Sequence, residues 1–208
     1  MKNIAVLVSG GGTNLQALIN AQNDGTINNG RINLVLSSSP DAYALERARL
    51  NNIRQCVIDR SLYNKRGLFS TAIADALDSF NTDLVVFAGF NYILNDEVIR
   101  KYKYRMINVH PSLIPSFCGK GFYGLRTHIA VLNSGVMITG ATVHFVTEVP
   151  DGGPIILQKA VPVCRSDTPE ILQHRVMEEA EWVILPEAVN LFCSDRLYIV
   201  DNIVYIRE

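Results

Sequence analysis

The segment Asn108-Val109-His110-Pro111-Ser112 combines residue types that together can carry out acid–base chemistry. It ends an apolar run with the character of a strand. Residues two apart in a strand face the same side, so Asn108 and His110 are expected to converge on one space. An amide donor beside an imidazole can stabilise an oxyanion while the imidazole moves a proton. The alternative for an isolated His110 is a structural histidine that satisfies local backbone groups before a proline turn.

A carboxylate follows in the turn-forming stretch Val149-Pro150-Asp151-Gly152-Gly153-Pro154. If Asp151 lies against His110, it favours the charged form of the imidazole and raises its pKa. We therefore expect Asn108, His110 and Asp151 to form one catalytic group.

The other histidines are weaker candidates for chemistry. His144 alternates with apolar neighbours, and the pattern allows it to face either inward or outward. His128 and His174 lie in helical surroundings and are expected on the surface.

The stretch Ser9-Gly10-Gly11-Gly12-Thr13-Asn14 lies between the first apolar run and a helical pattern. Glycines let a backbone approach a ligand closely, and the first amides of a helix point outward at the positive end of its dipole. The turn therefore suits a phosphate group, and a position at the carboxyl end of a parallel strand favours a binding crevice. It matches neither a P-loop nor a G-x-G-x-x-G motif, and a tight turn without a ligand is the alternative.

Short apolar runs alternate with helical patterns in the first half of the chain. The runs are apolar on both faces and bounded by Gly, Asn or Asp, as in a buried parallel sheet: residues 4–8, 32–36, 55–58, 84–88 and 106–109. The helical patterns fall at residues 14–21, 41–51, 69–80 and 95–102. This alternation predicts an α/β fold with a Rossmann-like, mostly parallel sheet flanked by helices.

The second half changes to an antiparallel pattern. Residues 139–147 and 155–163 predict two antiparallel strands joined by the turn that carries Asp151. Residues 191–198 and 203–206 flank Asp201-Asn202 and predict a terminal hairpin.

A long helix is expected to begin at about Thr168, with Asp167 as its N-cap and Glu170 at the capping-box position. We interpret residues 1–208 as one domain. Its nucleotide-binding half covers residues 1–105 and its catalytic half covers residues 106–208.

Charge and cysteine spacing narrow the class of protein. The formal net charge of −1 offers no basic excess for nucleic acid or an anionic membrane surface. The four cysteines are far apart and form no ligand cluster, so we expect reduced thiols in the cytoplasm and no metal site. The apolar run Ile4–Val8 is too short for a signal peptide or a membrane span.

Along almost its whole length the chain resembles the phosphoribosylglycinamide formyltransferases, also called glycinamide ribonucleotide transformylases. The resemblance rests on residues 8–17, 88–90, 107–115 and 142–158. The Asn-x-His-Pro-Ser-Leu and Asp-Gly-Gly-Pro segments also resemble other folate-dependent formyltransferases, whereas the full glycine loop selects the purine-pathway enzyme. The resemblance implies formyl transfer from 10-formyltetrahydrofolate to the glycyl amine of N1-(5-phosphoribosyl)glycinamide, a step of de novo purine biosynthesis. Both substrates are small molecules, and the reaction would need no metal.

The resemblance also implies roles for individual residues. His110 would be the proton donor, Asn108 would help hold the oxyanion, and Asp151 would raise the pKa of His110. The ribonucleotide would be bound by Gly12, Thr13 and Asn14 at its phosphate, and by Glu181 near its ribose, provided that one residue is inserted in the helix of Glu181. Folate binding is assigned mainly to the half that covers residues 106–208. The folate contacts implied by the resemblance, some of which lie before residue 106, are Arg66, Asn91, Tyr92, Ile93, Leu94, Asn108, Thr147, Glu148, Val149, Pro150 and Asp151.

Two stretches depart from the family pattern. Members often carry Met-Arg where this chain has Asn91-Tyr92, so backbone contacts would survive there but a guanidinium contact would not. Residues 116–124 are longer than in a shorter form of the family. Because this loop follows the catalytic strand, it is either a lid over the substrate or a surface insertion that only packs.

Other functions are compatible with parts of the pattern. A methionyl-tRNA formyltransferase would be expected to add a carboxyl-terminal domain and a basic surface, and a formyltetrahydrofolate hydrolase to add an amino-terminal domain. An N-formyltransferase acting on an amino-sugar nucleotide shares the chemistry and is the nearest alternative. A non-catalytic folate- or nucleotide-binding module is the alternative from another class, although such a module needs no acid–base pair. Either a monomer or a homodimer is compatible with the sequence.

Overall fold

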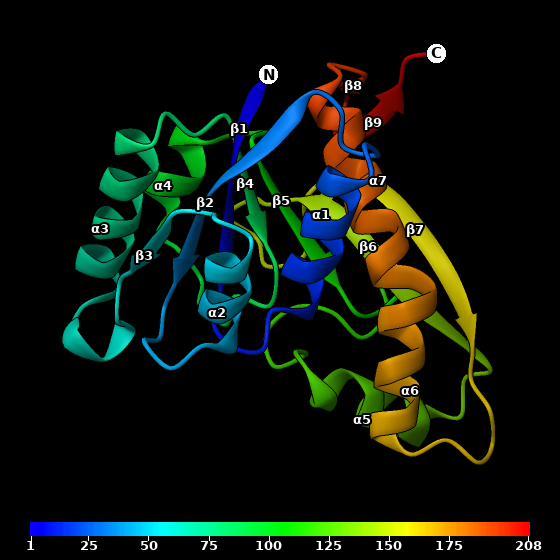
Figure 1. The fold of residues 1–208 in the computed structure, drawn as a ribbon. Coiled ribbons are helices and arrows are strands. Elements are labelled where there is room, and N and C mark those ends of the chain that lie inside the picture. Colours follow the sequence, from blue (N-terminus) through cyan, green and yellow to red (C-terminus); the bar gives the residue numbers. More distant parts are fainter.

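A seven-stranded sheet forms the centre of the computed structural model, which describes residues 1–208 (Figure 1). The strand order is β3-β2-β1-β4-β5-β6-β7. The first five strands are parallel, and β6 pairs antiparallel with both β5 and β7, so the antiparallel pair β6–β7 lies where the sequence predicted it. The strands are β1 (Lys2–Val8), β2 (Gly30–Ser37), β3 (Gln55–Val57), β4 (Leu84–Phe87), β5 (Met106–His110), β6 (Ile138–Phe145) and β7 (Ile155–Pro162).

Helices cover both faces of the sheet because its central strands are apolar on both sides. Alternate residues of β1 enter two separate cores, with Ile4, Val6 and Val8 in one core and Ala5 and Leu7 in the other. The first core is completed by α1 (Thr13–Asn23), α2 (Tyr43–Leu50), α5 (Leu125–Ser134), α6 (Pro169–Val176) and α7 (Trp182–Cys193), and the second by α3 (Arg66–Ser79) and α4 (Asp96–Lys101).

The strand order places a topological switch point between β1 and β4. From β1 the chain passes outward to β2 and β3, and then returns to β4 and β5 on the other side of β1. Ligands of open α/β sheets bind at such a point, beyond the carboxyl ends of the strands. The glycine turn after β1 and His110 at the end of β5 both lie at this edge.

Two helix starts differ from those expected from the sequence. The N-cap of α6 is Thr168, whose side chain accepts a hydrogen bond from the amide of Ile171, and not Asp167. Asp167 instead accepts two hydrogen bonds of 2.6 Å from Arg175. Two charge-assisted hydrogen bonds to a guanidinium are stronger than the single bond to a backbone amide that an N-cap makes. Helix α3 begins at Arg66, earlier than the expected Phe69.

The expected terminal hairpin is present but shorter. Residues 191–193 belong to α7, and the hairpin consists of β8 (Leu197–Val200) and β9 (Ile203–Ile206) as a separate two-stranded sheet. Two short helical turns complete the fold, the 3₁₀ turn η1 (Arg60–Leu62) and the π-helical turn η2 (Met177–Glu181). No helix is both long enough and apolar enough to cross a membrane.

Candidate active site

Strand pairing brings Asn108 and a second histidine together. Asn108 of β5 lies opposite His144 of the antiparallel strand β6. The Asn108 amide nitrogen Nδ2 donates a hydrogen bond to His144 Nε2 at 3.2 Å, and His144 Nδ1 donates to the Phe145 carbonyl at 2.9 Å. An amide nitrogen has two hydrogens, so Asn108 keeps one donor for another acceptor. His144 is 2% exposed, which settles its orientation as inward.

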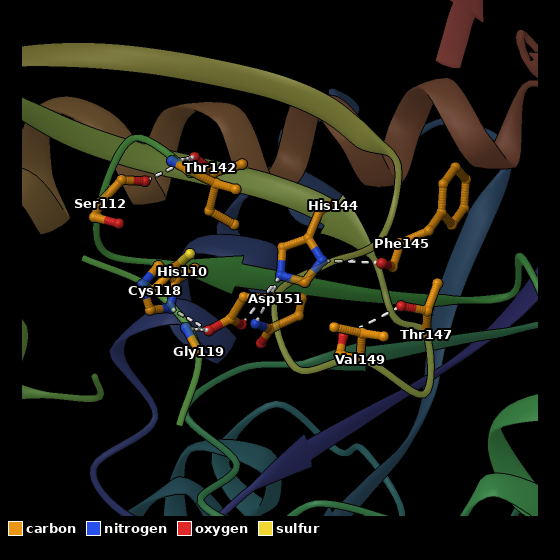
Figure 2. Close-up of polar contacts among 12 residues, drawn as sticks. His110, Ser112, Cys118, Gly119, Thr142, His144, Phe145, Thr147, Val149 and Asp151 are labelled. Atoms are coloured by element: carbon orange, nitrogen blue, oxygen red, sulfur yellow. Dashed lines mark hydrogen bonds and ion pairs between the residues drawn. The ribbon is translucent and has the colours of Figure 1, made fainter. Parts of the chain in front are cut away.

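Asp151 lies between two histidines in the turn that joins β6 to β7 (Figure 2). Its Oδ2 is 3.5 Å from His110 Nδ1, and its Oδ1 is 3.5 Å from His144 Nε2. The backbone amide of Gly119 donates to Oδ2 at 2.8 Å. The structure therefore brings Asn108, His110 and Asp151 together and adds His144 to them.

The loop of residues 116–124 contacts both members of the His110–Asp151 pair through its backbone. Besides the amide of Gly119, the carbonyl of Phe117 accepts a hydrogen bond from His110 Nε2 at 2.9 Å. This carbonyl requires a hydrogen on Nε2, so the proton that His110 gains or loses is the one on Nδ1, which faces Asp151. The loop thus sets the tautomer of the imidazole.

Burial decides the pKa of His110. The side chain is almost fully enclosed, which disfavours the imidazolium, and the nearby His144 acts in the same direction. The charge of Asp151 and the Phe117 carbonyl raise the pKa, but less than burial lowers it, so the net pKa lies below the ordinary value. Asp151 therefore acts on the pKa of His110 in the expected direction, but burial outweighs its effect.

Asp151 is ionised at neutral pH despite its partial burial. Burial raises the pKa of the carboxyl, but the contact with His144, the charge of His110 and the amide of Gly119 lower it more. The site therefore contains a stable carboxylate beside a neutral imidazole that can take up a proton on Nδ1.

Glu181 is joined to the glycine turn by a buried hydrogen bond. The Asn14 amide nitrogen donates to Glu181 Oε2 at 2.7 Å. Burial raises the pKa of Glu181 to about 7, although this hydrogen bond opposes the shift. Glu181 ends the π-helical turn Met177–Glu181, and single π-helical turns of this kind are frequent at functional sites.

A cavity of about 600 Å³ connects these groups. Its wall includes Thr13, Asn14 and Glu181, the stretch of Asn91, Tyr92, Ile93 and Leu94, and the group of Asn108, His110 and Asp151. Thr147 and Pro150 line it as well, whereas Gly12, Arg66, Glu148 and Val149 do not. Glu148 instead pairs with Arg100 at 3.2 Å, and Val149 is 64% exposed.

One residue of the cavity wall, His128, lies where the sequence did not place it. His128 is 1% exposed and lines the cavity, so its expected surface position is wrong. Burial and the charge of His110 lower the pKa of His128 to about 4. His144 and residues 119–124 also line the cavity. Alternation marked His144 as a possible inward residue, but the burial of His128 depends on how α5 packs against α6.

Comparison with known proteins shows the family of the chain. A family model described as formyl transferase matches residues 2–189. The phosphoribosylglycinamide formyltransferase of Haemophilus influenzae is 39% identical over 206 residues, which cover 99% of this chain and 94% of that protein. A crystal structure of glycinamide ribonucleotide transformylase 1 from Symbiobacterium toebii superposes with a TM-score of 0.94 at 42% identity, over 100% of this chain and 95% of that one.

A longer relative contains a matching segment. The trifunctional purine biosynthetic protein adenosine-3 of Bos taurus is 44% identical over 199 residues, or 96% of this chain. The chain spans only 19% of the length of that relative. With a family model over most of its residues, a shared fold and full-length similarity to the bacterial relative, this chain belongs to the formyl transferase family.

Proposed function

We propose that this protein transfers the formyl group of 10-formyltetrahydrofolate to the glycyl amine of N1-(5-phosphoribosyl)glycinamide, in purine biosynthesis. The observation that carries the proposal is the cavity, whose wall contains both Thr13 and Asn14, at the end of the glycine turn, and the His110–Asp151 pair. The names of the relatives support the same substrates. All of these side chains come from one chain, so a monomer and each subunit of a homodimer would be equally competent.

The ribonucleotide would enter at the part of the cavity formed by Thr13, Asn14 and Glu181. The first amides of α1 have no partners within the helix and carry the positive end of its dipole, so they favour a phosphate. The ionised carboxylate of Glu181 would accept a hydrogen bond from a ribose hydroxyl. The hydrogen bond between Glu181 and Asn14 fixes the position of the ribose contact relative to the phosphate contact.

The folate would lie beside Asn91–Leu94 and the turn of Thr147 and Pro150, which also line the cavity. Backbone groups of these stretches supply hydrogen bonds to a pterin ring without depending on side-chain identity. Tyr92 packs edge-on against Phe69 and Phe90, which fixes the path of the chain there. Three of the expected folate contacts lie outside the cavity lining, and we place them at the mouth of the cavity: Arg66, Glu148 and Val149. Gly12 also lies outside the lining, and we place its contact with the phosphate at the glycine turn.

The reaction requires stabilisation of an oxyanion and movement of one proton. The glycyl amine attacks the formyl carbon, and the free N–H of Asn108 stabilises the resulting oxyanion. The attacking nitrogen loses one proton, and the folate N10 gains one as the C–N bond breaks, so no net proton is consumed. Protonated His110 donates to the leaving nitrogen, while Asp151 stabilises the imidazolium. We place the protein in the cytoplasm, a reducing compartment that suits its four free cysteines.

An absorbance assay for tetrahydrofolate formation tests the proposal. The protein is mixed with 10-formyltetrahydrofolate and the ribonucleotide, and in a second reaction with an amino-sugar nucleotide. Product in the first reaction alone is expected, with a rate that falls about 10²–10⁴-fold in His110→Ala. His174→Ala is the matched control, because His174 is exposed and outside the cavity. Absence of product with the ribonucleotide would refute the proposal.

A further inference from the structure

Helix α2 holds the glycine turn from behind. The amide of Ala44 donates a hydrogen bond to the Gly10 carbonyl at 3.0 Å, and Arg47 Nε donates to the Gly11 carbonyl at 2.9 Å. The approach is close, because a Cβ atom at Gly12 would lie 2.6 Å from the Cβ of Ala44. The φ of Gly12 is +71°, in the left-handed region that glycine adopts without strain.

These two hydrogen bonds determine which way the peptide groups of the turn point. In a planar trans peptide the carbonyl and the N–H of the next residue point in opposite directions. With the carbonyls of Gly10 and Gly11 directed at α2, the amides of Gly11 and Gly12 are directed away from it. Neither amide donates a hydrogen bond within the protein. Two free donors therefore extend the row of unpaired amides at the start of α1.

Arg47 also brings a positive charge that no carboxylate neutralises. Its Nη1 donates to Gln16 Oε1 at 3.0 Å, so the guanidinium bridges the turn and the first part of α1. The guanidinium lies 5.2 Å from the centre of the Tyr43 ring, and it forms no ion pair. The neighbouring Glu46 is already paired with Arg49 at 2.6 Å. The positive charge of Arg47 can therefore attract an anion bound on the other side of the turn, with only the backbone of the turn between them.

We propose that Arg47 is a positioning residue for the ribonucleotide phosphate. It orients the peptide group between Gly11 and Gly12, while the amide of Ala44 holds the one between Gly10 and Gly11, and it adds positive charge behind the amides of the turn. The inference rests on the proposed function, since it takes the ribonucleotide phosphate as the ligand of the turn. It assigns Arg47 no contact with the reacting formyl group.

Steady-state kinetics of Arg47→Met test this role. We expect the KM for the ribonucleotide to rise about tenfold, the loss typical of a hydrogen bond to a charged group. The kcat and the KM for 10-formyltetrahydrofolate should stay within about twofold, because those steps do not involve the turn. Arg49→Met is the matched control, since Arg49 pairs only with Glu46 on the same helix and should show wild-type values.

Two further measurements separate positioning from general damage. Arg47→Lys keeps the charge but cannot bridge both the Gly11 carbonyl and Gln16, so its KM for the ribonucleotide should still rise several-fold. A wild-type KM in this variant would overturn the positioning role. With the dephosphorylated riboside as substrate, Arg47→Met and the wild type should have equal kcat/KM, because the riboside has no phosphate to position.

Equal losses of Arg47→Met on the phosphorylated and dephosphorylated substrates would overturn the inference, as would a fall in kcat with unchanged KM. Binding of ribose 5-phosphate, followed by calorimetry, should weaken in parallel with the KM. Failure of the proposed function is distinguishable from these results, because the wild-type protein itself would then form no product.

Discussion

His110 is engaged at both ring nitrogens, and its behaviour depends on the balance between the two contacts. The Phe117 carbonyl holds the Nε2 hydrogen, and Asp151 faces Nδ1 from 3.5 Å. Burial keeps the ring mostly neutral in the free protein. Asp151 partly offsets this effect, which keeps a fraction of the imidazole in the protonated form that a proton donor requires.

Replacing Asp151 with Asn should change the pH dependence of turnover. The carboxylate is the largest influence that raises the pKa of His110, so its removal lets burial lower that pKa further. As the pH rises, His110 would then lose its proton at a lower pH than in the wild type. We expect the alkaline decline of the kcat profile to move to lower pH and the rate at neutral pH to fall about tenfold or more.

Asp167→Asn is the control for this experiment, because Asp167 pairs with Arg175 outside the cavity. Its pH profile should match that of the wild type. A profile of Asp151→Asn that also matches the wild type would mean that Asp151 does not tune the histidine.

Glu181 should make folding stability depend on pH. Its pKa is raised to about 7 in the folded protein, whereas the unfolded chain has a value of about 4.3. Between these values the folded protein retains a proton that the unfolded chain releases, so stability is lost as the pH rises through this window. Relative to the wild type, Glu181→Gln should gain up to about 3 kcal/mol on going from pH 4 to pH 8.

Urea unfolding of both proteins across this range measures the difference. Glu179→Gln provides a matched control, because Glu179 is exposed in the same π-helical turn. Parallel stability curves for Glu181→Gln and the wild type would contradict the raised pKa.

At the scale of elements, the turn between β6 and β7 places Asp151 accurately because it is tightly packed. Asp151 itself has a φ of +54°, and the next residues are glycines. A Cβ atom at Gly153 would lie 1.8 Å from the Phe145 carbonyl oxygen, so this close approach excludes any other residue. The Asp-Gly-Gly-Pro segment is therefore required by the backbone conformation of this turn, in addition to the catalytic role proposed for Asp151.

Gly153→Ala should displace this turn. We expect a loss of about 2–4 kcal/mol in stability and a fall in kcat, because the carboxylate of Asp151 would move with the backbone. Gly67→Ala in α3 is the control, since nothing lies within 4 Å of a Cβ there and alanine favours a helix. Thermal unfolding and turnover measured on both variants check the prediction. Wild-type kcat in Gly153→Ala would show that the turn tolerates the displacement.

The sequence left the loop of residues 116–124 as either a lid over the substrate or a surface insertion that only packs, and the structure shows its contacts with the site. Its backbone holds His110 and Asp151, and its residues 119–124 line the cavity. Gly119, Gly121 and Gly124 all have positive φ, and no atom lies within 4 Å of a Cβ at any of them. The loop thus combines a fixed first part with a second part that few contacts restrain.

At the scale of the whole molecule, stability is concentrated in the centre of the sheet. Every residue of β4 is buried, as are residues 4–8 of β1, and each strand is paired on both sides. The terminal hairpin forms a separate sheet with exposed residues such as Tyr198, Val200 and Ile203. The molecule is therefore expected to open locally at its terminus well before it unfolds globally.

Hydrogen exchange followed by mass spectrometry should reveal this gradient. Amides of β1 and β4 should exchange only through global unfolding, with a urea dependence equal to that of the equilibrium transition. Amides of β8 and β9 should exchange faster and with a weaker urea dependence. Equal protection of the hairpin and the central strands would mean that the hairpin unfolds together with the main sheet.

The sequence by itself determined the α/β class, the alternation of strands and helices, and the identity of the polar residues at strand ends. These features are local, because hydrophobic periodicity and turn residues depend on neighbours in the chain. The five parallel strands and the antiparallel pair all lie where the pattern predicted them. The resemblance to a family added the formyl group and the folate, which no local pattern contains.

Only the tertiary structure decided the orientation of His144, the burial of His128 and the net pKa of His110. Each depends on contacts between segments distant in sequence: the register of β5 against β6, the packing of α5 on α6, and the closure of the cavity around one imidazole. The pair of Asp151 and His110 shows the division clearly. Residue type predicted a carboxylate that raises the pKa, whereas the enclosing side chains determined that burial outweighs it.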